Sequence, residues 1–213
     1  MKKILFLAFL IVSISVSGQS SLKDFFKLSG PIRVWVVFHP FSAKKSLKIA
    51  NETNRVTDSI VKTDALDGDA SGGQVDAFRH AYWMARLTQE MGERAAISLG
   101  KAHEKENYLT YKKRRLEDGV VPDEISSEMD LYNNGQGVKL ISKGSKVSKK
   151  GLIYRIVNAI NSGKLKVIKK DKKGNFLTCN GEIIAKEELK GKWKNNKCLI
   201  SSEKDKNIPY IKG

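Results

Sequence analysis

The chain has 213 residues, and 40% of them are hydrophobic, which is enough for one sizeable buried core. Two cysteines exclude both a disulfide-dense scaffold and a zinc site made of several cysteines. The net charge of +16 is concentrated at one end, because residues 142–213 hold 19 Lys and Arg against 6 Asp and Glu. Such asymmetry suggests contact with an anionic partner, although a lysine-rich solvated surface explains it as well.

The first 18 residues predict a secretory signal peptide. Lys2 and Lys3 precede an apolar run over residues 4–16, and small residues follow up to Gly18, where cleavage fits best. The run is too short to span a bilayer, although an uncleaved anchor helix is the alternative. We therefore predict a secreted or periplasmic protein without a transmembrane segment after cleavage. In such an oxidising compartment, a disulfide between Cys179 and Cys198 is favoured over two free thiols.

Helical periodicity covers most of residues 19–163. Residues 32–38 are ambiguous between a helix and a strand, and Ser42 is a plausible N-cap for a helix over residues 42–62. Further helices are predicted over residues 76–90, 93–108, 123–141 and 151–161.

The pattern changes near residue 164. Short strand-like segments occupy residues 165–168, 175–179, 182–184 and 198–200, and Asn180-Gly181 is a strong hairpin signal. The sequence therefore predicts an α+β chain, with a mainly helical body of five or six helices over residues 19–163. A small, lysine-rich antiparallel β appendage follows over residues 164–213.

Three predicted helices carry polar groups that can face one point. Asp76 and His80 are one turn apart on the first, His103 lies on the second, and Asp130 and Asn134 share a face of the third. Asp76, His80, His103 and Asp130 have the ligand types of a zinc or other divalent site, which would activate a bound water.

The same groups allow other interpretations. Glu104 or an unligated aspartate can serve as a general base, and without a metal the histidines can form an acid–base pair with Arg79 as an anion clamp. Buried His, Asp and Asn side chains also satisfy one another and fix the register of helices, so a purely structural network is the competing hypothesis.

The loop before the first of these helices has a separate pattern. Asp67, Asp69 and Ser71 alternate and are followed by glycine, as in the first half of a calcium loop, but the acid expected at the twelfth position is replaced by Phe78. A turn rich in Asp that caps the next helix is the alternative.

Three sequence blocks carry a family resemblance: residues 76–83 (DAFRHAYW), 102–104 (AHE) and 129–134 (MDLYNN). In their combination the chain resembles an uncharacterised family of secreted or toxin-associated bacterial domains over about residues 72–165. The family has no settled activity, so the resemblance implies organisation and not mechanism.

Two functional hypotheses follow. The first is a hydrolase, with or without the assistance of zinc or calcium, that acts on a phosphoester, lipid or envelope component. Its site residues are His80, His103, Asp130, Asn134, Arg79 and Glu104. The second is a non-catalytic binding module whose basic end holds an anionic envelope component or polysaccharide. Aromatic residues are sparse among the C-terminal lysines, so specific nucleic-acid binding is not expected.

Overall fold

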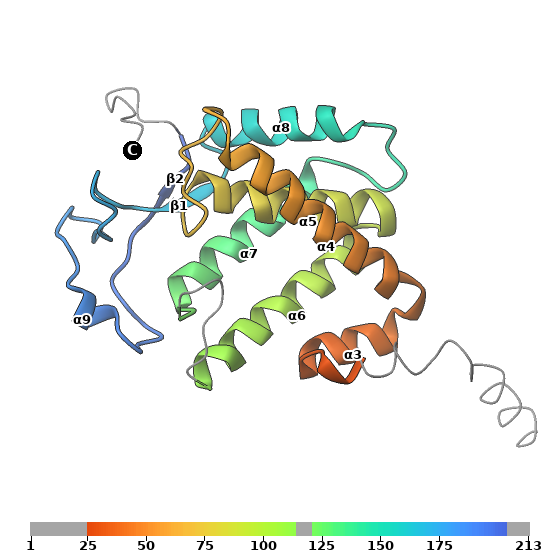
Figure 1. The fold of residues 1–213 in the computed structure, drawn as a ribbon, viewed down its shortest axis with the longest axis horizontal. Helices are drawn as coiled ribbons and strands as arrows, with labels where there is room; N and C mark the ends of the chain where they lie inside the picture. The colour runs from red at the N-terminus through yellow and green to blue at the C-terminus, as the bar shows by residue number, and fades with distance from the viewer. Residues whose placement is uncertain (1–24, 114–120, 204–213) are drawn as a thin grey trace, which may run out of the picture.

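A computed structural model describes residues 25–113 and 121–203 of the chain (Figure 1). The predicted signal peptide and the end of the predicted appendage lie outside these residues. Within them, a body of six helices, α3 to α8, precedes a small antiparallel sheet, which confirms the predicted α+β class. No helix in the described ranges is both long and apolar enough to cross a membrane.

Two helices form the N-terminal corner of the described chain. The ambiguous segment forms helix α3 (Gly30–Phe38), which begins after Ser29, whose hydroxyl accepts a hydrogen bond from the backbone N–H of Ile32. Helix α4 (Pro40–Val61) follows after one residue and begins earlier than the predicted Ser42 cap. Pro40 explains this start, because the fixed φ of proline suits the first turn of a helix.

The remaining helices of the body lie close to their predicted positions. They are α5 (Gln74–Met91), α6 (Glu93–Lys112), α7 (Glu124–Lys139) and α8 (Lys149–Asn161). Asp123 caps α7 and Ser148 caps α8, each through a hydrogen bond to a backbone N–H of the first turn. Helix α6 extends four residues beyond its predicted end, and α7 ends two residues before it.

Helix α5 is the centre of the molecule. Helices α4, α6, α7 and α8 all contact it, and in Figure 1 it runs through the middle of the bundle. Phe78, Tyr82 and Leu87 are completely buried along its length. Because α5 is surrounded, its polar residues are also removed from water, so each of them needs a partner inside the fold.

The sheet is smaller than the sequence predicts. Strands β1 (Lys166–Ile168) and β2 (Leu199–Ser201) pair antiparallel, with Val167 opposite Ile200. The predicted strands over residues 175–179 and 182–184 are wrong as strands, since only isolated bridges form there. The backbone of this segment divides its hydrogen bonds between several neighbours: Leu177 donates to Lys169 and accepts from Cys198. A continuous two-strand ladder therefore does not develop.

The predicted turn at residues 180–181 does form. The backbone N–H of Thr178 donates to the Glu182 carbonyl across it, and Gly181 has a φ of +90°, a conformation that favours glycine. A short helix, α9 (Lys186–Leu189), follows the turn. Cys179 and Cys198 form the predicted disulfide, which closes this irregular segment onto the start of β2.

The C-terminal segment is tied to the helical body through buried polar contacts. The Asn133 side chain on α7 donates to the Lys166 carbonyl and accepts from the Lys166 N–H, both at 2.9 Å. Gln74, at the start of α5, donates to the Ser202 carbonyl at 2.8 Å. The sheet therefore covers one end of α5 and α7, next to the predicted site.

Candidate metal centre between α5 and α7

Helices α5 and α7 bring three of the predicted ligands together. The His80 Nε2 lies 3.2 Å from an Asp130 carboxylate oxygen and 3.6 Å from an Asp76 carboxylate oxygen. All three side chains are buried, and one ligand atom from each lies within 4.8 Å of the others. In a tetrahedral zinc site with ligand bonds of about 2.0–2.1 Å, neighbouring ligand atoms are about 3.3 Å apart. The observed separations therefore suit a divalent cation.

A close helix crossing makes this meeting possible. Gly137 lies two turns after Asp130 on α7 and faces the backbone of Ala81 on α5. A Cβ at position 137 would lie 2.8 Å from the Ala81 Cα, closer than real side chains come. The absence of a side chain at Gly137 thus lets the two helices approach until His80 and Asp130 are in contact.

Two donors hold the Asp76 carboxylate from either side. The Gly72 N–H donates to its Oδ2 at 2.7 Å, and the Arg79 guanidinium donates to its Oδ1 at 2.7 Å and 3.2 Å. Gly72 reaches this position with a φ of +90°, which a residue with a side chain rarely adopts. Hydrogen bonds of this kind orient metal ligands in proteins, and they equally stabilise a carboxylate in a structural network.

A small pocket of about 70 Å³ opens above the carboxylates. Asp76 and Asp130 line it, as does Arg79, so the acidic groups and a guanidinium share one opening. The opposite wall comes from the start of α7 and from the C-terminal segment, which contribute Asp123, Ser126, Ile168, Phe176 and Lys197.

Sequence patterns did not reveal this opposite wall. The Lys197 ammonium lies 2.5 Å from the Asp123 carboxylate and 3.9 Å from the centre of the Phe176 ring, and the Lys197 and Asp123 side chains are almost completely buried. Asp123 has a sequence signal, because it follows Pro122 at the predicted start of a helix. Lys197 is one lysine among many in the basic region, and only the tertiary contact distinguishes it.

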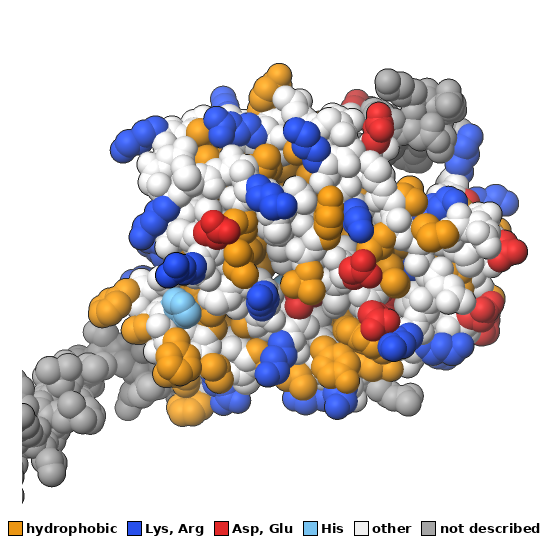
Figure 2. Space-filling model, turned by 180° about the vertical axis from the view of Figure 1, so that it is seen from behind, with side chains coloured by type: hydrophobic (Ala, Val, Ile, Leu, Met, Phe, Trp, Pro, Cys, Tyr) orange, Lys and Arg blue, Asp and Glu red, His pale blue; other side chains and the backbone are white. Residues whose placement is uncertain are grey.

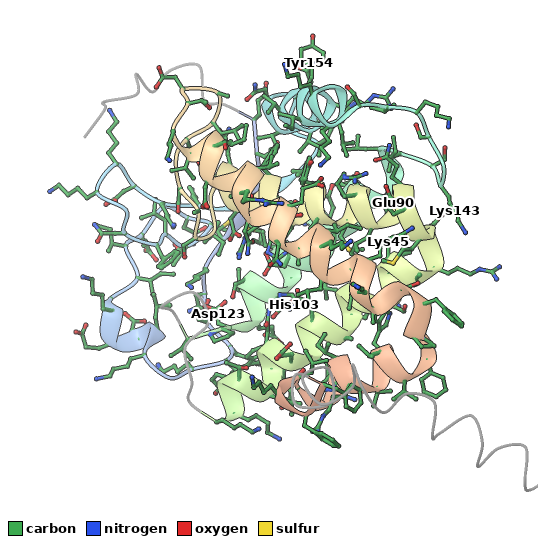
Figure 3. The ribbon with its side chains drawn as sticks, turned by 45° about the vertical axis from the view of Figure 1, so that its right-hand side comes forward. Lys45, Glu90, His103, Asp123, Lys143 and Tyr154 are labelled. Carbon is green, nitrogen blue, oxygen red and sulfur yellow. A yellow bond between two sulfur atoms is a disulfide. The ribbon has the colours of Figure 1, made fainter. Side chains whose placement is uncertain are left out.

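The other predicted site residues lie beside this group and not within it. His103 on α6 packs its ring edge-on against Trp83, with the ring centres 5.5 Å apart, and is not part of the metal-competent group found in the described residues (Figure 3). Glu104 is buried and accepts a hydrogen bond from Asn107, which lines the pocket.

Asn134 is also buried, but it faces α6. Its amide nitrogen lies 3.5 Å from the position of a Cβ on Gly100, one turn before Glu104. Neither polar atom of its side chain has a hydrogen-bond partner within the described parts of the chain. It shares a helix with Asp130, yet the structure does not join it to the Asp76, His80 and Asp130 group.

The loop proposed for calcium uses its oxygens in another way. Asp67 accepts hydrogen bonds from the backbone N–H groups of Asp69 and Gln74, and Asp69 accepts from the N–H of Ser71 and from the Lys170 ammonium. Burial raises the pKa of Asp67 and outweighs the lowering by these backbone donors. The Asp67 contacts agree with the alternative interpretation as a capping turn, because Asp67 accepts from backbone N–H groups at the start of α5, whereas the Asp69 carboxylate bonds within the loop and to Lys170.

The fold and site together define a mainly helical domain with a buried group of one histidine and two aspartates. Asp76 and His80 lie on the central helix α5, and Asp130 lies on α7. A family described as Domain of unknown function (DUF6973) matches residues 33–164, and the chain belongs to this family. The match confirms the predicted membership of an uncharacterised domain family and begins earlier than the predicted span. No curated protein and no solved structure matches the chain.

The family region ends before β1. It contains Asp76, His80 and Asp130, whereas Lys197 and Phe176 on the opposite wall of the pocket lie beyond it. The metal-competent group is therefore built from the family region alone, and the C-terminal segment completes the pocket above it.

Proposed function

We propose that the chain is a metal-assisted hydrolase that acts on an anionic ester, with Asp76, His80 and Asp130 as the metal ligands. The observation that carries the proposal is the convergence of these three buried side chains next to a pocket that their carboxylates line. One histidine and two carboxylates are the ligand types that zinc and similar divalent ions bind, and they leave positions for water and substrate.

The charges around the pocket favour a negatively charged substrate once a divalent cation is bound, because the carboxylates that line it otherwise outnumber its cationic groups. Arg79 lines the pocket next to the ligands, and its planar guanidinium suits a phosphate or carboxylate group. A divalent cation between two aspartates adds further positive charge at the same place. The pocket is small, at about 70 Å³, and Arg79 lines it, so a compact anionic group such as a phosphate suits it. We therefore favour a phosphoester over the lipid and envelope substrates that the sequence also allowed.

The chemistry follows from the ligand set. A bound divalent ion lowers the pKa of its water and supplies a nucleophile near neutral pH. Arg79 would neutralise charge on the ester, while the Gly72 N–H holds the Asp76 carboxylate in place. We assign Glu104 and Asn107 as positioning groups behind the ligands, because Asn107 donates a hydrogen bond to Glu104 and lines the pocket.

Metal analysis tests the proposal directly. Elemental analysis of the purified mature protein, or calorimetric titration of the chelator-treated protein with zinc and manganese, should show one divalent ion per chain. The Asp130→Asn variant keeps its shape but loses a charged ligand, so its affinity should fall by about 100-fold, whereas His103→Ala should still bind metal. Hydrolysis of bis-(p-nitrophenyl) phosphate should require the metal and be lost in Asp130→Asn.

A non-catalytic binding module is the second candidate, and one observation favours it. The Asp76 carboxylate already receives three hydrogen bonds, and the His80 imidazole bridges to Asp130, as in a network that only stabilises helix packing. In that case a chelator leaves the melting temperature of the wild-type protein unchanged, and Asp130→Asn lowers it equally with and without chelator. A metal centre gives the opposite result, because the chelator then destabilises only the wild-type protein.

We also propose that the protein acts outside the cytoplasm. The disulfide between Cys179 and Cys198 is typical of oxidising compartments and agrees with the predicted signal peptide. Sequencing the N-terminus of the exported protein should place cleavage after Gly18.

A further inference from the structure

Helix α3 is apolar on all sides except at Arg33, although only part of it is covered. Ile32, Trp35 and Val36 face inward and pack with apolar residues of α4 to α7. Val34 and Val37 point away from this cluster and are more than half exposed. A helix that is apolar all round normally has a partner on each side, so the outer side of α3 marks an interaction surface.

The exposed side continues across the turn into α4. Val34, Val37, Phe38 and Phe41, named here the apolar corner, are exposed by 58%, 62%, 76% and 98%. In Figure 2 hydrophobic side chains gather at this corner, beside Lys and Arg side chains. Four large apolar side chains within eight residues, nearly all in water, form a continuous patch and not scattered exposures.

The sequence that forms the apolar corner is basic. Residues 25–51 contain no Asp or Glu, and their basic residues are Lys27, Arg33, Lys44, Lys45 and Lys48. Lys44 and Lys48 are exposed and follow Phe41 by one and two turns, on the same side of α4. Lys45 reaches back to Glu90, 3.3 Å away. Large apolar side chains followed by exposed lysines on the same side of a helix are typical of segments that lie in the surface of an anionic membrane.

We propose that the apolar corner binds the surface of an anionic phospholipid bilayer. Phe38 and Phe41 enter the boundary between headgroups and acyl chains, while Lys44 and Lys48 lie over lipid phosphates. Helix α3 has nine residues and is about 14 Å long, so it lies along the surface and cannot cross a hydrocarbon core of about 30 Å. A second copy of the chain is disfavoured as the occupant, because two such basic corners repel each other.

Sedimentation with vesicles tests this proposal. Wild-type protein should bind vesicles of phosphatidylcholine mixed with phosphatidylglycerol more tightly than vesicles of phosphatidylcholine alone. The double variant Phe38→Ser/Phe41→Ser should lose binding by about tenfold or more, because each phenyl ring contributes more than one tenfold step when it leaves water. Lys44→Glu/Lys48→Glu should lose the preference for the anionic lipid.

Matched controls separate this surface from the basic C-terminal region. Tyr154 and Lys150 are exposed on α8, so Tyr154→Ser/Lys150→Glu should bind vesicles like the wild type. All variants change exposed side chains, and unchanged melting curves will show that they fold. Equal binding by wild type and the Phe38→Ser/Phe41→Ser variant would overturn the proposal, as would no binding to anionic vesicles. A wild-type dimer that only this variant dissociates, without vesicle binding, would assign the corner to self-association instead.

Discussion

At the scale of single residues, the candidate centre depends on a glycine as much as on its ligands. Gly137 contributes no side chain, and that absence determines how near Asp130 comes to His80. Gly72 acts in a similar way, because its backbone conformation presents an N–H to Asp76. The chemistry of the ligands is visible in the sequence, whereas their separation is determined by residues without functional groups.

Replacing Gly137 by alanine should separate the two helices. The added Cβ meets the Ala81 backbone, which cannot move without shifting α5, so we expect a loss of about 1–3 kcal/mol in the free energy of unfolding. Gly135→Ala on the same helix is the matched control, because no described atom lies within 4 Å of the new Cβ. That variant should be as stable as the wild type or gain up to about 1 kcal/mol from helix propensity. Urea unfolding of both variants distinguishes them, and equal stabilities would contradict the close crossing.

At the scale of elements, one carboxylate joins three helices. Glu52 on α4 accepts hydrogen bonds from Tyr82 and Arg86 on α5, both within 2.9 Å, and its other oxygen lies 2.6 Å from the Lys149 ammonium at the start of α8. Burial by itself would raise the pKa of Glu52, but the hydrogen bonds from Lys149, Arg86 and Tyr82 outweigh it, so the pKa lies below its ordinary value of 4.5. Burial and the Glu52 carboxylate raise the pKa of Tyr82, which therefore stays protonated as the donor.

The Glu52→Gln variant should reveal this junction through pH. A carboxyl group whose pKa is lower in the folded than in the unfolded chain stabilises the fold at pH values above 4.5 and loses this effect as pH falls through the lowered value. We expect the free energy of unfolding of the variant to be about 1–3 kcal/mol lower than that of the wild type at pH 7, and this difference should shrink below pH 4.5. Glu90 is a more exposed partner of Arg86, so Glu90→Gln should lower the free energy of unfolding much less. Thermal unfolding between pH 3 and pH 7 measures both, and a deficit independent of pH would contradict the assignment.

At the scale of the whole molecule, the basic C-terminal segment is part of the fold and not a loose tail. Lys197 forms a buried ion pair with Asp123 at the start of α7, and Lys170 forms a partly exposed ion pair with Asp69 in the loop before α5. Both ammonium groups also lie over the Phe176 ring. Lys197 therefore lines the pocket, and Lys170 ties the segment to the loop before α5.

Removing the disulfide should loosen this segment and spare the helices. The Cys179→Ser/Cys198→Ser variant opens a loop of about 20 residues. For such a loop, the loop-entropy model gives a decrease of about 3 kcal/mol in the free energy of unfolding. Far-ultraviolet circular dichroism should keep its helical signal, and metal affinity should persist because the ligands lie on α5 and α7. Unfolding with and without a phosphine reductant provides the comparison: the reductant should destabilise the wild type and leave the variant unchanged. Equal unfolding of wild type and variant would contradict this role.

Local patterns were sufficient for much of the architecture. Apolar periodicity predicted the helices of the body, because the apolar residues of an amphipathic helix recur every three to four positions along the sequence. The two cysteines predicted their own pairing, and Asp76 and His80 were recognisable as a pair because four residues make one helical turn.

Contacts between residues that are far apart in the sequence were determined only by the tertiary structure. It joined Asp130 to His80, directed His103 against Trp83, and brought Lys197 to Asp123 across 74 positions of sequence. It also reduced the predicted hairpin to isolated bridges, because backbone groups pair with whichever neighbour the fold supplies. A sequence pattern specifies which way a side chain faces on its own helix, but the packing of the helices determines what that side chain meets.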